Sequence, residues 1–128
     1  MSDATYPTEL KYHKEHDWAR IDGDIAEFGI TWFAQDALGD VVYFNPPEVG
    51  DSIAANGSYG ELESVKAVSD LIAPLDGEVV EVNDKVISTP ELVNSDPYTA
   101  WLVRIRMTDT AQADDLLSAA DYEALVSN

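Results

Sequence analysis

Cysteine is absent from the 128-residue chain, which excludes disulfide bonds, thiolate metal sites and cysteine nucleophiles. Basic residues are scarce: seven Lys and Arg stand against 25 Asp and Glu, for a formal net charge of −18 at pH 7. Such an acidic chain repels phosphates, which argues against nucleic acid as a partner. No stretch approaches the roughly 18 apolar residues of a membrane span, and the first residues lack the features of a signal peptide. We therefore expect a cytoplasmic protein that is not bound to a membrane. Location in an organelle is the alternative if a presequence was removed.

The excess of acid has two possible explanations. Acidic surfaces with few lysines suit a highly saline cytosol, because salt screens the repulsion between like charges. Alternatively, the protein is an ordinary acidic protein that docks on basic faces of its partners. The sequence leaves both explanations open.

The pattern of residues predicts one domain over 1–128, made mainly of β-strands. A chain of this length can bury one core but not two. Residues 18–21 and 25–28 flank Asp22-Gly23, which predicts a hairpin. Residues 41–44 predict a further strand, which the following prolines end. Two similar segments, 49–53 and 82–86, lie on either side of a central turn and favour two small sheets packed face to face.

Two helices are indicated by their ends. Thr31 predicts the start of a short helix that reaches Ala37, and Gly39 follows where a left-handed stop is expected. Near the C-terminus, Ser118 with Asp121 three residues later predicts the start of a terminal helix. The expected helical segment covers about residues 110–126. The residues expected to share the packed face of the terminal helix are Tyr122, Leu125 and Val126.

One lysine has an unusual setting. Lys66 lies between two runs that alternate like strands, within an apolar and acidic segment. A lysine on a tight turn between strands projects its amine into water, where a modifying enzyme can reach it, and the strands fix the base of an attached arm. This geometry suits a carrier better than a catalyst. Because no nucleophile, base and orienting group occur together at a suggestive spacing, we do not expect an enzyme.

The motif around this lysine resembles a known family. Glu63-Ser64-Val65-Lys66-Ala67, followed by Ser69-Asp70, is similar to the lipoylation site of the glycine cleavage system H-protein family. Further blocks follow the family's order and spacing from about Tyr12 to Arg106. They are residues 15–18, 29–31, 34–35, 38–42, 47–50, 73–74, 77–83 and 90–98.

The resemblance implies a fold and a cofactor. The fold would be a mainly β barrel-sandwich hybrid of the lipoyl/biotinyl-domain type, with a short helix in the N-terminal half and helices at the C-terminus. Lipoate would be joined to Lys66 as N6-lipoyllysine by a lipoate ligase or a lipoyl/octanoyl transferase. The flanking residues of the modification motif would be Glu63, Ser64, Val65 and Ala67.

The resemblance also implies a function. The lipoyl arm would take the aminomethyl group of glycine from a pyridoxal-phosphate glycine decarboxylase to a folate-dependent aminomethyltransferase, and electrons to lipoamide dehydrogenase. The chain would be a monomeric, non-catalytic carrier in glycine catabolism and one-carbon metabolism. Its contribution would be a high effective concentration of a tethered reactant.

Three acids are candidates for a cleft that receives the loaded arm. The cargo would be a cation that water can hydrolyse, so a sheltered site lined by carboxylates would protect it. Glu15, Asp17 and Asp70 are the candidates by position, and the last two match acids of the family. The family commonly has Glu at position 17. Because the Asp side chain is shorter, the sequence does not decide whether Asp17 touches the arm. Trp32 and Ile72 also depart from the family's usual residues.

Two other functions stay open at this stage. An H-like lipoyl donor would hand its lipoyl group to 2-oxoacid dehydrogenases, and the sequence does not separate this role from the glycine shuttle. A biotinyl carrier subunit of a carboxylase is the third possibility. Biotinyl lysines usually lie between two methionines, whereas Lys66 lies between Val65 and Ala67.

A metal site is not expected. His13 and His16 are the only histidines, and their spacing would suit a metal only on a helix. The segment is expected to be extended and has no third ligand nearby in sequence, whereas metal sites need three or four ligands.

Overall fold

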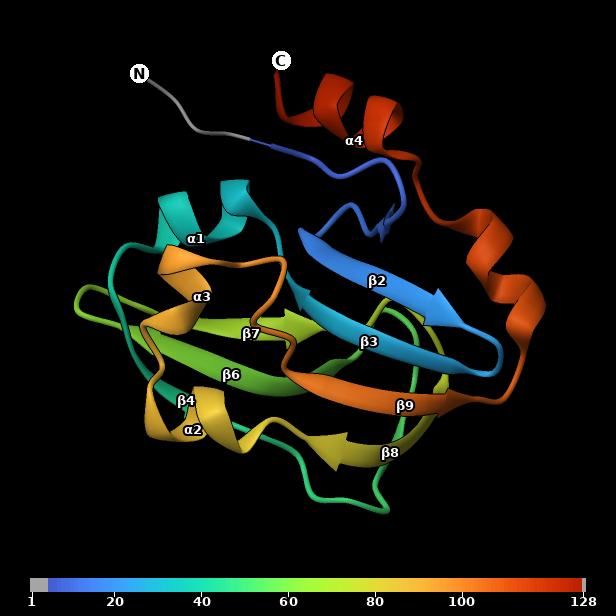
Figure 1. Ribbon diagram of the computed structural model, residues 1–128, viewed down its shortest axis with the longest axis horizontal. Helices are drawn as coiled ribbons and strands as arrows, with labels where there is room; N and C mark the ends of the chain where they lie inside the picture. The colour runs from blue at the N-terminus through green and yellow to red at the C-terminus, as the bar shows by residue number, and fades with distance from the viewer. Residues whose placement is uncertain (1–4, 128) are drawn as a thin grey trace.

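The structure, a computed structural model, describes residues 5–127 and consists of two antiparallel sheets with helices at their edges (Figure 1). The larger sheet has the strand order β1-β2-β3-β9-β8-β5, and the smaller sheet has the order β4-β6-β7. This arrangement confirms the mainly β, two-sheet barrel-sandwich fold. The strands are β1 (Lys11–Tyr12), β2 (Asp17–Asp22), β3 (Ile25–Ile30), β4 (Val41–Asn45), β5 (Ser52–Ile53), β6 (Ser58–Ser64), β7 (Val68–Ile72), β8 (Gly77–Val82) and β9 (Val103–Met107).

Short helices connect and close the sheets. The helices are α1 (Trp32–Leu38), α2 (Asp84–Ser88), α3 (Leu92–Ser95) and α4 (Ala119–Val126), with a 3-10 helix η1 (Thr110–Asp115). Within residues 5–127, no helix has the length and apolar character needed to cross a membrane.

Both sheets contribute to one hydrophobic core. Phe28 of β3, Phe44 of β4, Leu62 of β6 and Ile105 of β9 are each at most 1 % exposed and belong to the same cluster. Burying a side chain of this size stabilises the fold by about 1.5–3 kcal/mol. The two inner faces therefore form the main source of stability and hold the strands of the smaller sheet in place.

The predicted ends of the helices are confirmed by hydrogen bonds. The Thr31 hydroxyl accepts the Ala34 N–H at 3.2 Å at the start of α1, and Gly39 follows with φ = 85°. At the start of α4, the Ser118 hydroxyl accepts the Asp121 N–H at 3.2 Å. Each side chain satisfies an amide that has no partner within its own helix.

Two expectations about local structure are wrong. Leu125 is 45 % exposed and does not share the packed face of α4, which is anchored by the fully buried Tyr122. The segment with the two histidines is a turn and not an extended strand, because the His16 N–H donates to the His13 carbonyl at 2.9 Å. His16 has φ = 81° at the end of this turn.

The two similar segments of the sequence do not fold alike. Residues 49–53 form a turn and β5, whereas residues 82–86 end β8 and begin α2. Asn83 explains the difference, because its side chain accepts the Lys85 N–H at 3.1 Å and starts a helix there. The face-to-face sheets are present, but they do not arise from an internal repeat.

The net charge leads to a prediction about salt. Raising KCl from 0.01 M to 1 M shortens the Debye length from about 30 Å to 3 Å and weakens the repulsion among the acids. We expect the melting temperature to rise by about 4 °C, which corresponds to roughly 1 kcal/mol for a domain of this size. A variant with Asp24, Asp36 and Glu123 changed to amides is the control and should respond less. If the melting temperature of the wild type does not change with salt, adaptation to a saline cytosol is contradicted. Docking on basic faces of partners would then be the explanation that stays.

Candidate functional site

The lysine singled out by the sequence lies at the tip of the β6–β7 hairpin, which extends beside α1 and α3 (Figure 1). Lys66 is exposed. Ser64 closes the turn beneath it, since its N–H donates to the Ala67 carbonyl at 2.8 Å. The Ser64 hydroxyl accepts the N–H groups of Lys66 at 3.2 Å and Ala67 at 3.1 Å. The serine of the motif therefore fixes the backbone from which the lysine projects.

The tip of the hairpin is fastened to the corner between α1 and β4. The Val65 N–H donates to the Asp40 carbonyl at 3.0 Å. A Cβ added to Gly39 would lie 3.4 Å from Cε of Lys66, so the lysine stem runs over the glycine. The Asn94 side chain donates to the Gly39 carbonyl at 2.9 Å and holds the corner from α3. Sequence reasoning missed Asn94, because its partners, two backbone groups and the Gln35 side chain, are more than 50 residues away.

A cleft of about 320 Å³ lies beside the hairpin and is lined by Ala67, the neighbour of the lysine. All three predicted acids line it: Glu15 from the turn before β2, Asp17 from β2 and Asp70 from β7. Segments far apart in the sequence therefore bring three carboxyl groups to one hollow. The larger apolar side chains of its wall are Ile30, Phe33, Leu38, Leu62, Val68 and Leu71.

The three acids differ in their surroundings. Glu15 and Asp70 are exposed, whereas Asp17 is only 2 % exposed and accepts a 2.5 Å hydrogen bond from the Tyr59 hydroxyl. Burial raises the pKa of the Asp17 carboxyl well above its ordinary value, and the hydrogen bond from Tyr59 opposes this rise only in part. The short Asp side chain thus has a buried partner. No sequence pattern pointed to Tyr59, which looks like an ordinary core residue of β6.

The burial of Asp17 predicts how stability depends on pH. The pKa of Asp17 is higher in the folded protein than its ordinary value of 3.8. Between these two pKa values the folded protein keeps a proton on Asp17 that the unfolded protein has lost. The free energy of unfolding should therefore be highest at the acid end of this window. It should fall as pH rises towards the folded pKa, by at most about 1.4 kcal/mol per pH unit.

Asp17→Asn should remove this contribution while keeping an acceptor for Tyr59. Urea unfolding at a series of pH values should give a flatter profile for Asp17→Asn than for the wild type. Asp22→Asn is the matched control, because it removes an exposed aspartate from the same strand and leaves Asp17 in place. Identical profiles for the wild type and Asp17→Asn would contradict the assignment.

The wall of the cleft is tied to the C-terminal helix. Nδ1 of His16 and Oγ1 of Thr31 each lie 2.8 Å from the Tyr122 hydroxyl. The His16 ring also packs on Phe33, with 4.7 Å between centroids. Burial lowers the pKa of His16 and therefore favours the neutral ring. α4 thus holds both the turn that presents Glu15 and the start of α1.

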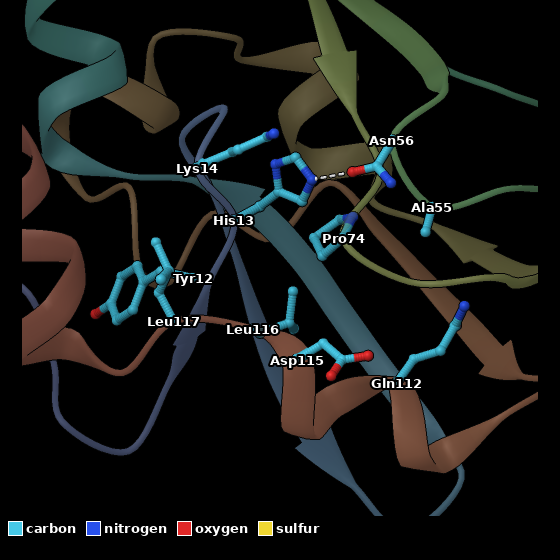
Figure 2. A pocket seen from close by; sticks show the side chains of 10 residues that line it. All are labelled: Tyr12, His13, Lys14, Ala55, Asn56, Pro74, Gln112, Asp115, Leu116 and Leu117. Carbon is cyan, nitrogen blue, oxygen red and sulfur yellow. Dashed lines mark hydrogen bonds between the residues drawn. The ribbon is translucent and has the colours of Figure 1, made fainter.

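The other histidine, His13, lines a different hollow (Figure 2). Nε2 of His13 lies 2.6 Å from Oδ1 of Asn56, and its Nδ1 accepts the Glu15 N–H at 2.9 Å. These contacts require the proton on Nε2, so the imidazole joins two loops. The two histidines have separate partners. Among residues 5–127, no group of three or more His, Cys, Asp or Glu side chains is arranged to hold a metal ion.

Two packed sheets with an exposed lysine at the tip of a fastened hairpin define a carrier domain of the lipoyl/biotinyl type. Comparisons with known proteins narrow this class. Residues 10–128 match the glycine cleavage H-protein family. The chain belongs to the glycine cleavage system H-protein family, whose members carry lipoate, and its role is that of a lipoyl carrier in glycine cleavage.

Relatives cover nearly the whole chain. The chain is 52 % identical over 121 residues to the glycine cleavage system H protein of Carboxydothermus hydrogenoformans, covering 94 % of this chain and 93 % of that protein. It is 52 % identical over 122 residues to the H protein of Symbiobacterium thermophilum, covering 94 % and 95 %. The crystal structure of the H protein from Mycobacterium marinum superposes with a TM-score of 0.87 at 39 % identity, covering 95 % and 99 %. These relatives confirm the family that the motif blocks indicated.

Proposed function

We propose that Lys66 is the residue that carries lipoate and that the chain, as a single domain, is the non-catalytic shuttle of the glycine cleavage system. It would receive the aminomethyl group at a pyridoxal-phosphate glycine decarboxylase, deliver it to a folate-dependent aminomethyltransferase and pass electrons to lipoamide dehydrogenase. The observation that supports this best is the exposed Lys66 amine at a fastened hairpin tip beside a cleft with three carboxyl groups. We further propose that it acts as a monomer in the cytoplasm.

The residues around the lysine fit a lipoyl arm. Attachment needs the Lys66 amine to lose a proton and attack the acyl carbon of an activated lipoyl group, so that an amide forms and the activating group leaves. Gly39 leaves room for the stem, and the apolar wall of the cleft suits a hydrocarbon chain. When attached, the lipoyl disulfide supplies a reducible acceptor for a one-carbon fragment and two electrons.

The acids of the cleft would shelter the cargo. Asp70 and Glu15 present carboxylates to a bound cation, and the buried Asp17 adds a third carboxyl, for which burial favours the neutral form. Attraction between a cation and a carboxylate strengthens where water is excluded. The walls would also keep water from the cargo until the arm swings out.

Reconstitution with the other components tests this function. Lipoylated protein should support the exchange of labelled bicarbonate into glycine by the decarboxylase, and unmodified protein should not. The lipoyl-donor alternative predicts transfer of the lipoyl group to a 2-oxoacid dehydrogenase domain in the presence of a lipoyltransferase. Transfer without glycine exchange would contradict the shuttle and favour the donor.

A further inference from the structure

The hairpin that bears Lys66 has an apolar outer face as well as the cleft on its inner side. Tyr43, Glu63 and Val68 lie side by side in one row across β4, β6 and β7. Tyr43 is 51 % exposed and Val68 is 60 % exposed. The neighbouring row, Phe44 and Leu62, is buried in the core. By the alternation of strands, the row with Tyr43 points away from the core and towards solvent. Val68 also lines the cleft, so it lies where the two faces of the hairpin meet.

A bulge in β4 enlarges this apolar face. The pairing of β4 with β6 passes from Val41↔Ser64 to Tyr43↔Glu63, so Val42 is an extra residue. It is 54 % exposed, directly next to Tyr43. Bulges are often placed where a strand has to redirect a side chain. We call Val42, Tyr43, Val65 and Val68 the outer hairpin surface; Val65, beside the lysine, is 71 % exposed.

Apart from Lys66, the charged residues around this surface are acidic. Residues 41–72 contain five acids, and Lys66 is their only basic residue. The row behind Tyr43 and Val68 pairs Asn45, Glu61 and Asp70, of which Asp70 also lines the cleft. A partner that covers the outer hairpin surface would therefore meet apolar side chains next to the lysine and carboxylates one row further on. Its complementary surface is an apolar socket with a basic rim.

The reach of the lysine identifies the partner. An extended lysine stem spans about 6 Å from Cα to Nζ, so an enzyme that acylates the amine must touch the hairpin itself. With the lipoyl group attached, the reactive end lies roughly 14 Å from Cα, so enzymes acting there can stand away from the hairpin. Resting on the proposed attachment at Lys66, we propose that the outer hairpin surface is the docking site of the enzyme that attaches the arm, and that basic residues of this enzyme meet Glu61.

Rates of attachment test the docking site. Unmodified full-length protein is incubated with lipoate–protein ligase, ATP and lipoate, and initial rates are followed by intact mass. Tyr43→Ser and Val68→Thr should each lower kcat/KM on the order of tenfold, because truncated anchors in interfaces have effects of this size. Val68→Thr keeps a β-branched strand residue. Val49→Ser is the matched control, since Val49 is 64 % exposed but lies outside the surface, and it should keep the wild-type rate.

Two further measurements separate the possible outcomes. Glu61→Lys should lower kcat/KM more at low salt than at high salt, and equal effects would contradict the basic rim. Tyr43→Ser protein that has been fully lipoylated by long incubation should support glycine exchange at the wild-type rate. An equal loss in that reaction would overturn the assignment to the attaching enzyme.

The result for the wild type distinguishes this inference from the proposed function. If the wild type is not lipoylated at all, the proposed function fails and the docking site with it. If the wild type is lipoylated and Tyr43→Ser and Val68→Thr are modified at the wild-type rate, only the docking site is overturned. Unchanged melting temperatures of both variants would show that a lower rate does not come from unfolding.

Discussion

Lys66→Arg is expected to abolish glycine exchange completely while leaving the fold unchanged. The guanidinium keeps the positive charge but offers no amine that a ligase can acylate, so the variant should show no increase in mass. The side chain is exposed, and the turn beneath it is held by Ser64 and by backbone groups. The melting temperature should therefore stay within about 1 °C of the wild type, as for most exposed substitutions.

Lys85→Arg is the matched control. Lys85 is also exposed, but it lies on α2 and not on the hairpin. This variant should be lipoylated and should support exchange at the wild-type rate. Residual lipoylation of Lys66→Arg, or loss of lipoylation in Lys85→Arg, would contradict the assignment.

The second large effect is expected for the stability of the cargo. Asp70→Asn should leave lipoylation largely intact, because it changes neither the exposed Lys66 amine nor the outer hairpin surface. The loaded protein, kept without folate, should release ammonia about tenfold faster than the wild type. This factor corresponds to roughly 1.4 kcal/mol, close to the lower end of the range for a hydrogen bond to a charged group.

The other acids of the cleft refine this test. Asp17→Asn should also speed the release of ammonia, but by less than Asp70→Asn, because burial raises the pKa of Asp17 and so disfavours the charged form that attracts a cation. Asp36→Asn is the control, because Asp36 is an exposed acid of α1 that does not line the cleft. Equal release rates in all variants would mean that the acids are only a solvated face, and the cleft would lose its protective role while the carrier role remained.

Local signals in the sequence predicted the elements that present the lysine. The β2–β3 hairpin was predicted from Asp22-Gly23, but its two-residue loop is Gly23-Asp24, because Asp22 pairs with Ile25. Gly23 has φ = 66°, as a tight turn requires. Thr31 marks the start of α1 because its side chain accepts a backbone N–H of the first turn. Gly39 marks the end because it has no side chain to hinder the positive φ there. The position of Lys66 on a hairpin follows in the same way from the alternation on either side.

Features that depend on distant partners could not be predicted. Tyr59 reaches Asp17 across 42 residues, and Asn94 reaches Gly39 across 55. The bulge at Val42 arises from the pairing of β4 with β6, which an apolar run does not reveal. Short helices such as α2 and α3, with 5 and 4 residues, have too few turns to show a periodic pattern.

The central claim is that Lys66 alone carries lipoate, and mapping the modification tests it most directly. The wild-type protein, incubated with lipoate ligase, ATP and lipoate, is measured intact, then digested, and its peptides are sequenced by mass spectrometry. We predict a single lipoyl increment, located on the peptide that contains Lys66. A lipoyl increment on Lys85 or another lysine, or a biotin increment when biotin and a biotin ligase are supplied, would contradict the account.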